Sequence, residues 1–225
     1  MKNSSSIKNI ILSLGLIAIP TLSLAAPISS YSSPDNSGVY VGLSGGYHLT
    51  HSTLKVSNNE TVNGSFNSNG VMGAVALGYL ACFGSENMAI EIDANKASKP
   101  GLSRSVGTQT VTRGAISASY SVNILPGLDI GKHGELFFRL GYERGHYEFK
   151  STSGGNKFEH NTYLTGYNLG TGYAIKLGRH LSLRSEYYHT WFKHMNEGFS
   201  AITVTNKVRP SDNRFLVGLQ YHFVI

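Results

Sequence analysis

The sequence has little charge, a single cysteine and, after its first 25 residues, no long apolar run. Charged residues make up 14% of the 225 residues, whereas an average soluble domain contains about a quarter. The one cysteine, Cys82, excludes an internal disulfide, and without neighbouring partners a redox or metal role is not expected of it. No stretch after residue 25 approaches the ~20 apolar residues that a membrane-spanning helix needs. Any membrane embedding must therefore come from strands.

Residues 1–25 are predicted to be a signal peptide that is removed on secretion. Two lysines make a short basic start, an apolar run follows, and the small residues Ser23 and Ala25 stand before the expected cleavage site. Residues 26–37, rich in Ser and Pro, are expected to be a flexible leader. Residues 38–225 then form a single domain. Because the chain is secreted, nucleic acid is not an expected partner.

Apolar residues alternate with small or polar ones along eight segments of the remaining chain. In the last segment Phe215 and Val217 fall on one face of an extended strand and Leu216 on the other, and in the fourth Ile116 and Ala118 are predicted to face outward. Alternation over ~10 residues is typical of strands that cross an outer membrane with their apolar rows facing lipid. We therefore predict an all-β fold, an eight-stranded antiparallel transmembrane β-barrel of the outer-membrane type. The predicted strands are residues 38–50, 69–81, 87–96, 111–124, 135–149, 162–177, 181–192 and 214–225.

A soluble barrel has the same two-residue period, but two features favour a membrane barrel. Aromatic residues such as Tyr47, Tyr142 and Trp191 stand near the ends of the apolar rows, as in the aromatic belts at membrane surfaces. The opposite rows are mostly Gly, Ala and Ser, which fit the interior of a narrow barrel. A row facing solvent normally carries more Lys and Glu.

The predicted connections differ in length on the two sides of the barrel. Short turns are expected near Cys82, at Pro126-Gly127 and at Gly178, whereas the other connections are long and rich in Ser, Thr, Asn and Gly. Short periplasmic turns and long extracellular loops are typical of these barrels, so we expect both chain ends in the periplasm. Residues 201–208 alternate in a strand-like way and predict a hairpin beyond the membrane. The predicted long loops are residues 52–68, 97–110, 150–161 and 193–213.

Three pieces of the chain resemble a known family. They are residues 142–147 (Tyr-Glu-Arg-Gly-His-Tyr), 181–188 (Leu-Ser-Leu-Arg-Ser-Glu-Tyr-Tyr) and 213–223 (Asn-Arg-Phe-Leu-Val-Gly-Leu-Gln-Tyr-His-Phe). They look like the small opacity-type surface proteins and, more broadly, the OmpA-like and OmpX/Ail-like barrels. The resemblance implies a surface protein of the bacterial outer membrane, with the outer-membrane assembly machinery as a partner. The residues similar to the assembly signal are Gly218, Tyr221 and Phe223; the chain departs from the usual form by adding Val224 and Ile225.

Seven charged residues fall on the inward rows of the predicted strands. Four acids against three bases are close to balance, and an unpaired charge in a narrow interior is strongly penalised. We therefore predict an interior ionic network that fills the barrel. The alternative is a small pore whose selectivity these charges tune, although eight strands leave room for side chains rather than a water column. The seven residues are Glu91, Asp93, Arg139, Glu143, Lys176, Arg184 and Glu186.

Basic residues concentrate in the predicted long loops and the strand ends beside them. Eleven bases stand against the four acids Glu60, Glu159, Glu197 and Asp212, which gives +7. Two explanations stay open: attraction to the phosphates of outer-membrane lipopolysaccharide, or attachment to polyanions such as host glycosaminoglycans or an acidic matrix protein. The candidate polyanion-binding residues are Lys96, Lys99, Arg104, Arg113, Lys193, Lys207 and Arg209, and the count also includes Lys55, Lys150, Lys157 and Arg214.

No catalytic residue, metal ligand or cofactor is expected. Glu186, His189 and Thr190 lie close in sequence, but in a strand His189 points outward with Trp191 while Glu186 points inward. We predict that the protein is not an enzyme and that its role is that of a structural or adhesin-like surface protein. A narrow porin for small solutes is the alternative, and a lipid-modifying outer-membrane enzyme comes third.

Overall fold

The computed structural model describes residues 37–57, 61–98, 104–106, 109–153, 156–199 and 204–224. These residues form ten strands joined by turns, and none of the described segments is a helix that could cross a membrane. The predicted signal peptide, residues 1–25, and residues 26–36 of the predicted leader lie outside this part of the chain. The strands are β1 (Gly38–Ser57), β2 (Thr61–Phe83), β3 (Glu86–Ala97), β4 (Arg104–Val106), β5 (Gln109–Ile130), β6 (Gly134–Ser153), β7 (Asn156–Lys176), β8 (Leu181–Phe192), β9 (Met195–Phe199) and β10 (Val204–Val224).

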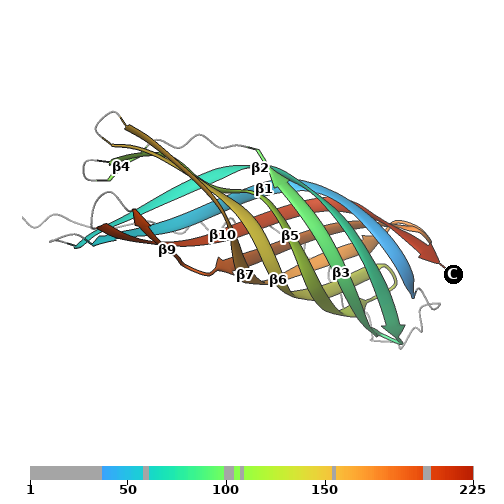
Figure 1. Ribbon diagram of the computed structural model, residues 1–225. Helices are drawn as coiled ribbons and strands as arrows, with labels where there is room; N and C mark the ends of the chain where they lie inside the picture. The colour runs from blue at the N-terminus through green and yellow to red at the C-terminus, as the bar shows by residue number, and fades with distance from the viewer. Residues whose placement is uncertain are drawn as a thin grey trace, which may run out of the picture.

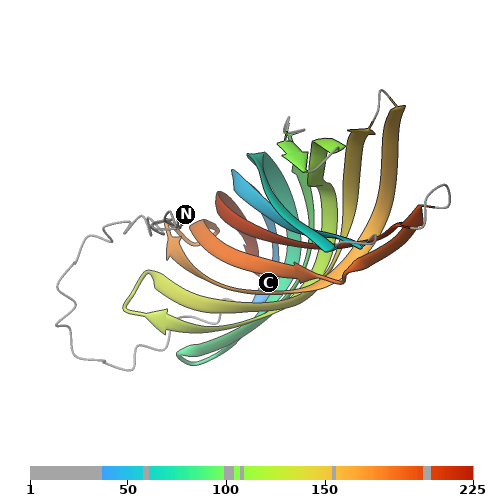
Figure 2. The same cartoon turned by 90° about the vertical axis from the view of Figure 1, so that its left-hand side faces the viewer.

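Eight of these strands close into an antiparallel barrel, which confirms the predicted fold. The hydrogen-bonded order is β1-β2-β3-β5-β6-β7-β8-β10, and β10 pairs back onto β1 from Gly38↔Val224 to Ser57↔Thr205. The short strands β4 and β9 add to β5 and β10. The strands wind obliquely around the barrel (Figure 1). The β1–β2 and β6–β7 pairs form long hairpins at one end, called here the long-hairpin end, and the C-terminus lies at the other. Figure 2, in which the long-hairpin end faces the viewer, shows the curvature of the sheet.

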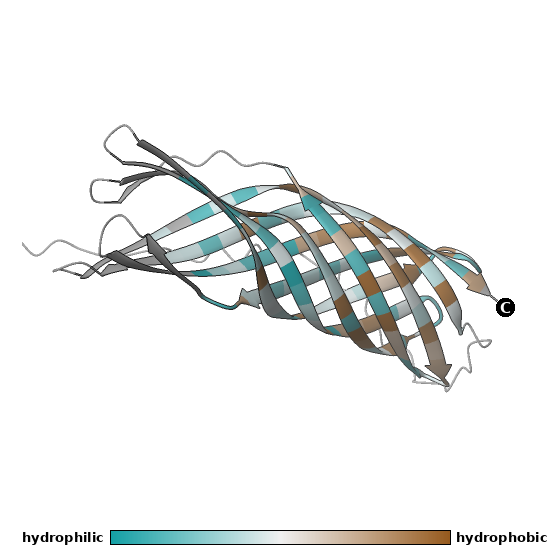
Figure 3. Ribbon diagram, viewed as in Figure 1, coloured by the Kyte–Doolittle hydropathy of each residue, from teal (hydrophilic) through white to brown (hydrophobic). Residues whose placement is uncertain are grey.

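The barrel turns its apolar rows outward. On β3 burial alternates at every residue, so that Ile90 and Ile92 are 60% and 51% exposed whereas Glu91 is 1% exposed. This is the inverse of a soluble domain, and so large an exposed apolar surface requires lipid around it. The apolar residues gather toward the end of the barrel that holds the C-terminus, and polar residues follow toward the long hairpins (Figure 3).

The strands run further than predicted at the long-hairpin end. β1 pairs with β2 as far as Ser57↔Thr61, and β6 pairs with β7 as far as Ser153↔Asn156. These segments are rich in Ser, Thr and Asn, which is why the sequence predicts loops there. Strand pairing is nevertheless favourable there, because it satisfies the main-chain N–H and C=O groups whatever the side chains are. The hairpin predicted at residues 201–208 is present as the pairing of β9 with residues 204–208; residues 201–203 lie outside the described chain.

A β-bulge in β5 changes which side chains face inward. The register of β5 against β6 shifts between Ile116 and Ala118, and an extra residue in one strand reverses the facing of the side chains beyond it. Ile116 is therefore buried, and its predicted outward placement is wrong. Simple alternation cannot reveal such a bulge, because the residues on both sides of it still alternate.

The predicted turn at Pro126-Gly127 is also wrong, because β5 continues to Ile130. Pro126 pairs with Met88 of β3, while the pairing of β5 with β6 stops after Ile124 and resumes at Gly127, so the residue without an N–H falls in a gap of that pairing. The chain turns later, at Gly131, whose φ of 67° is readily adopted only by glycine.

Candidate functional sites inside the barrel and at its loop end

The interior near the short turns is filled by an apolar layer. The ring of Tyr40 occupies space that Gly78 leaves free, since a Cβ atom at residue 78 would collide with it. The Tyr40 hydroxyl donates a hydrogen bond to Glu91 Oε2 at 2.8 Å, and Cys82 packs against the layer partly buried. The layer consists of Tyr40, Leu80, Ala89, Leu125, Phe137 and Ala174.

A first group of charged residues, the Arg139 cluster, lies on the long-hairpin side of this layer and joins β3, β6 and β8. It consists of Glu91, Asp93, Arg139, Arg184 and Glu186, each at most 8% exposed. Arg184 donates from Nη1 to Glu91 Oε2 at 2.6 Å and from Nη2 to Glu186 Oε2 at 2.7 Å. Arg139 pairs with all three carboxylates, at 3.2 Å from Glu91 and Glu186 and most closely with Asp93. The two-residue alternation of three strands points these side chains inward and brings together five of the seven residues expected inside the barrel.

A second group, the Arg214 cluster, lies nearer the long hairpins. It consists of His48, Glu143, Tyr188, Asp212 and Arg214, each at most 1% exposed. Arg214 Nη2 lies 2.6 Å from Glu143 Oε1, and Arg214 Nε lies 2.7 Å from Asp212 Oδ2. His48 Nδ1 is 3.3 Å from Asp212 Oδ1. The Tyr188 ring lies 4.4 Å from the Arg139 guanidinium and 5.4 Å from that of Arg214, so it joins the two clusters.

The sequence prediction places Glu143 inside the barrel but misses the rest of the Arg214 cluster. Arg214 and Asp212 belong to the predicted loop charges, and this placement is wrong because β10 begins at Val204 and carries both residues inward. Arg214 stands two residues before the inward Leu216, so it points to the same face of the strand. The alternation in the sequence could therefore have predicted its inward position. Without this pair the loop end has ten bases and three acids, so its charge stays at +7.

Lys176 lies apart from both clusters. Its Nζ atom is 3.2 Å from Asp129 Oδ2 and 3.3 Å from Asp129 Oδ1, near the short turn between β5 and β6. The structure thus gives this predicted network residue its own ion pair, beyond the apolar layer.

The spaces left between the inward side chains are small. Three hollows beside the two clusters and the apolar layer have volumes of about 20, 10 and 20 Å³. A single water needs ~10–15 Å³ of such space, so each hollow has room for about one water. Beside these three hollows, paired charges and closely packed side chains occupy the interior.

The residues considered for catalysis do not converge. Glu186 points inward to Arg184 and Arg139, whereas His189 lies on the outer side with its Nδ1 2.8 Å from Asn213 Oδ1 and its ring 4.4 Å from that of Trp191. Within the described chain, no group of three or more His, Cys, Asp or Glu side chains is arranged to hold a metal ion.

Six of the seven candidate polyanion-binding residues lie in the described chain, at the long-hairpin end; the seventh, Lys99, lies outside it. The six are Lys96, Lys193 and Arg209, whose side chains are exposed, and Arg104, Arg113 and Lys207, whose backbones belong to β4, β5 and β10.

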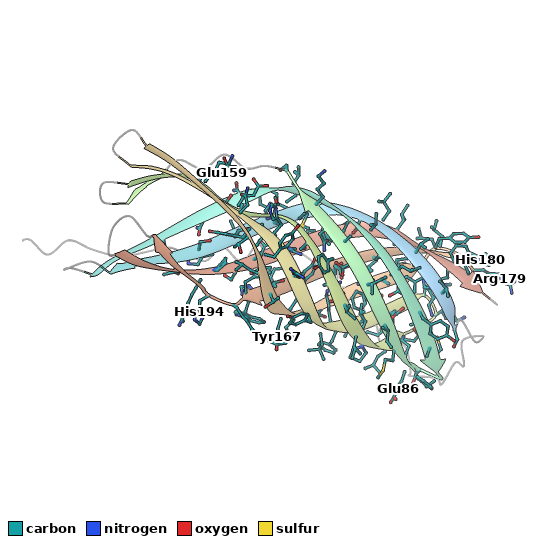
Figure 4. All side chains as sticks on the ribbon, in the orientation of Figure 1. Glu86, Glu159, Tyr167, Arg179, His180 and His194 are labelled. Carbon is teal, nitrogen blue, oxygen red and sulfur yellow. The ribbon has the colours of Figure 1, made fainter. Side chains whose placement is uncertain are left out.

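The strand register pairs like-charged residues with each other at this end. The strand register pairs Lys55 of β1 with Lys207 of β10, and Arg113 of β5 with Lys150 of β6. Lys150 is also paired with Glu159 of β7, with 2.5 Å between Nζ and Oε1. Glu159 is labelled at the long-hairpin end in Figure 4, far from Arg179 and His180 at the other end.

The closing strand has the geometry that its sequence suggests. Tyr221 and Phe223 are exposed on the outer face, and their rings lie 5.0 Å apart. Gly218 faces inward next to Ser44 of β1, where a Cβ atom would collide with the neighbouring strand. The role of Gly218, Tyr221 and Phe223 in assembly stays a prediction.

A closed eight-stranded barrel with apolar residues outside and paired charges inside defines the class of small β-barrels of the bacterial outer membrane. The sequence profile of the family described as outer membrane protein beta-barrel domain matches residues 14–223. The chain belongs to this family, and it is a protein of the bacterial outer membrane. A comparison with curated proteins gave no match.

Several solved outer-membrane structures are similar to this chain. OprG of Pseudomonas aeruginosa is 14% identical with a TM-score of 0.52, over 84% of this chain and 97% of OprG. Neisserial surface protein A is 14% identical with a TM-score of 0.43, over 83% of this chain and 98% of that protein. Ail of Yersinia pestis, in complex with the heparin analogue sucrose octasulfate, is 15% identical with a TM-score of 0.42, over 80% of this chain and 99% of Ail. At these identities the likeness shows the fold alone.

Proposed function

We propose that the protein is a surface protein that binds polyanions through the basic end of its barrel, with that end outside the cell. In outer-membrane barrels the short turns face the periplasm and the long connections face outward. The barrel ends Gly38 and Val224 pair with each other at the short-turn end, so this orientation places both in the periplasm.

The pairing of like charges at the loop end carries the proposal. Like charges directly opposite each other on neighbouring strands destabilise a sheet. The register imposes this arrangement on Lys55 and Lys207 and again on Arg113 and Lys150. A polyanion that binds both members of a pair neutralises the two charges together, so the register favours an anionic partner at these positions. Because Lys150 already pairs with Glu159, the Lys55–Lys207 pair is the sharper candidate.

The distance of this pair from the membrane favours a polyanion outside the lipid layer. Lys55 follows the outward aromatic Tyr47 by eight residues on the same strand, which is about 26 Å along a strand at ~3.3 Å per residue. Even with the ~40° tilt of barrel strands, the pair stands well beyond the aromatic belt. A host glycosaminoglycan or an acidic matrix protein fits this position better than the phosphates of the membrane itself.

The filled interior supports a binding role over that of a narrow porin. The Arg139 and Arg214 clusters occupy the cross-section that an ion has to pass, and the hollows beside them are each about the size of one water.

Removing the Lys55–Lys207 pair is expected to weaken polyanion binding. Two charge contacts with the polyanion of ~0.5 kcal/mol each correspond to roughly a fivefold loss of affinity, and the loss shrinks as salt rises. The measurement is the binding of labelled heparin to intact cells that display either the wild-type protein or the Lys55→Gln/Lys207→Gln variant.

The matched control is Lys132→Gln/Arg179→Gln, which removes the same charge at the short-turn end. Heparin binding by intact cells is expected to stay unchanged in this control. A third variant, Lys207→Glu, turns the repulsive pair into an attractive one, so it is expected to bind heparin less while unfolding no more easily than wild type. Equal heparin binding by the wild type and the Gln pair contradicts the proposal.

A further inference from the structure

A hollow lies in the outer wall of the barrel, at the edge of the apolar surface nearest the long hairpins. It spans β1 to β7 and has a volume of about 610 Å³, within the ~300–1,000 Å³ typical of small-molecule sites. The floor is made by Gly73, Ala94 and Ala118, and large side chains such as Tyr120 and Tyr163 rise around it.

The strand register explains why the wall is hollow there. Lys96 of β3 lies between Gly73 of β2 and Ala118 of β5, and Ala94 lies opposite Tyr120. Gly73, Ala94 and Ala118 are therefore diagonal neighbours on three adjacent strands, and all three lie on the outer face. At Gly73 the space is real: a Cβ atom built there has nothing nearer than the Ser44 carbonyl oxygen, at 3.9 Å.

Cationic side chains line one edge of this hollow. Lys96 and Arg144 are exposed on the outer face, on strands separated only by β5, with Arg144 two residues away from the register row of Lys96 and Ala118. At ~4.8 Å per strand and ~3.3 Å per residue, their Cα atoms are about 12 Å apart. The Arg144 guanidinium lies 4.9 Å from the centre of the Tyr163 ring, which holds it beside the hollow. His146 also lines the hollow, but its Nδ1 is 3.9 Å from Glu148 Oε1, so Lys96 and Arg144 are the two available cations.

We propose that this hollow is a binding site for one molecule of lipopolysaccharide, with an acyl chain over Gly73, Ala94 and Ala118 and a phosphate between Lys96 and Arg144. An apolar floor with cations at one edge matches a phosphorylated glycolipid, whose acyl chains and phosphates meet at the membrane surface. The inference rests on the proposed orientation, because lipopolysaccharide occupies the outer leaflet. It concerns residues other than the Lys55–Lys207 pair, which stands further from the membrane.

The test is the affinity of the purified, delipidated protein in detergent for lipopolysaccharide, with bound lipid counted by native mass spectrometry. We expect one molecule to bind more tightly than phosphatidylglycerol does. Because each cation near an anionic lipid contributes roughly fivefold, Lys96→Gln/Arg144→Gln is expected to weaken binding by about 25-fold. Filling the floor with Ala94→Leu is expected to weaken it by about tenfold, since the lost acyl contact corresponds to one or two buried CH₂ groups.

Two controls match these variants at the short-turn end. Lys132→Gln/Arg179→Gln removes the same charge, and Ala81→Leu enlarges another outward alanine; both are expected to leave the affinity within twofold of wild type. A further control changes the lipid and leaves the protein as wild type, so it does not depend on the folding of a variant. Dephosphorylated lipopolysaccharide is expected to bind the wild-type protein at least tenfold more weakly than intact lipopolysaccharide does.

The proposal is overturned if the Lys96/Arg144 variant binds as wild type does, if dephosphorylation has no effect, or if phosphatidylglycerol binds equally well. Loss of heparin binding in the Lys55/Lys207 variant with unchanged lipopolysaccharide binding is expected, since the two sites are separate. If the wild-type protein binds lipopolysaccharide but does not bind heparin, this site stands and only the proposed function is removed.

Discussion

Replacing Arg139 with alanine is expected to lower the free energy of unfolding by about 3–5 kcal/mol, the usual cost of removing one partner from a buried ion pair. Arg139 pairs with Glu91, Asp93 and Glu186, and Arg184 reaches only two of these three carboxylates. The variant therefore leaves Asp93 without a cationic partner in its cluster. The measurement is urea unfolding in phospholipid bilayers, followed by the fluorescence of Trp191, the one tryptophan in the chain.

A double variant tests whether the unpaired charge of Asp93 causes the loss of stability. Adding Asp93→Asn to Arg139→Ala returns the cluster to its original net charge and is expected to recover about half of the lost stability. Arg179→Ala removes an exposed arginine at the short-turn end and is expected to change stability by no more than about 0.5 kcal/mol. If Arg139→Ala unfolds like Arg179→Ala, the interior network does not hold the strands together.

Placing a charge on the outer face is expected to have the second largest effect. Ile92 stands in the middle of the apolar row of β3 and is exposed. In a bilayer Ile92→Arg is expected to destabilise the barrel by about 2–4 kcal/mol, because the guanidinium enters the hydrocarbon. At an exposed site of a soluble protein the same change costs about 0.5 kcal/mol or less, so the result separates the two environments.

A second position on the outer surface serves as the reference for Ile92. Ser65 is exposed near the long-hairpin end of β2, beyond the apolar rows, and Ser65→Arg is expected to leave urea unfolding unchanged. Equal effects at Ile92 and Ser65 are incompatible with an apolar row that faces lipid.

Most of the barrel could be predicted from the two-residue alternation, because a side chain on a strand has only two directions available. That rule places Glu91 and Ile92 on opposite faces and brings the Arg139 cluster together from three strands. It fails at Ile116, because a bulge adds one residue without changing the local pattern of residue types. It fails again at Pro126, where a proline that predicts a turn lies within a strand.

The candidate sites were harder to predict than the fold, because composition was a poor guide to where the strands end. Arg214 and Asp212 stand in a polar stretch that resembles a loop, yet β10 extends through it and buries both. The like-charge pair Lys55–Lys207 depends on the register between the first and last strands. No local pattern contains that register; it follows from closure of the whole barrel.

The central claim, that the apolar rows face hydrocarbon, is tested most directly by spin labels placed one at a time at positions 88 to 96 of β3, in a Cys82→Ser background and in liposomes. We expect a two-residue period in the accessibility of the labels. Labels at Met88, Ile90 and Ile92 collide with membrane-dissolved oxygen and are protected from a water-soluble nickel complex, whereas labels at the positions between them reach neither reagent. Free access of the nickel complex to the labels at Met88, Ile90 and Ile92 contradicts the claim that the apolar rows face hydrocarbon.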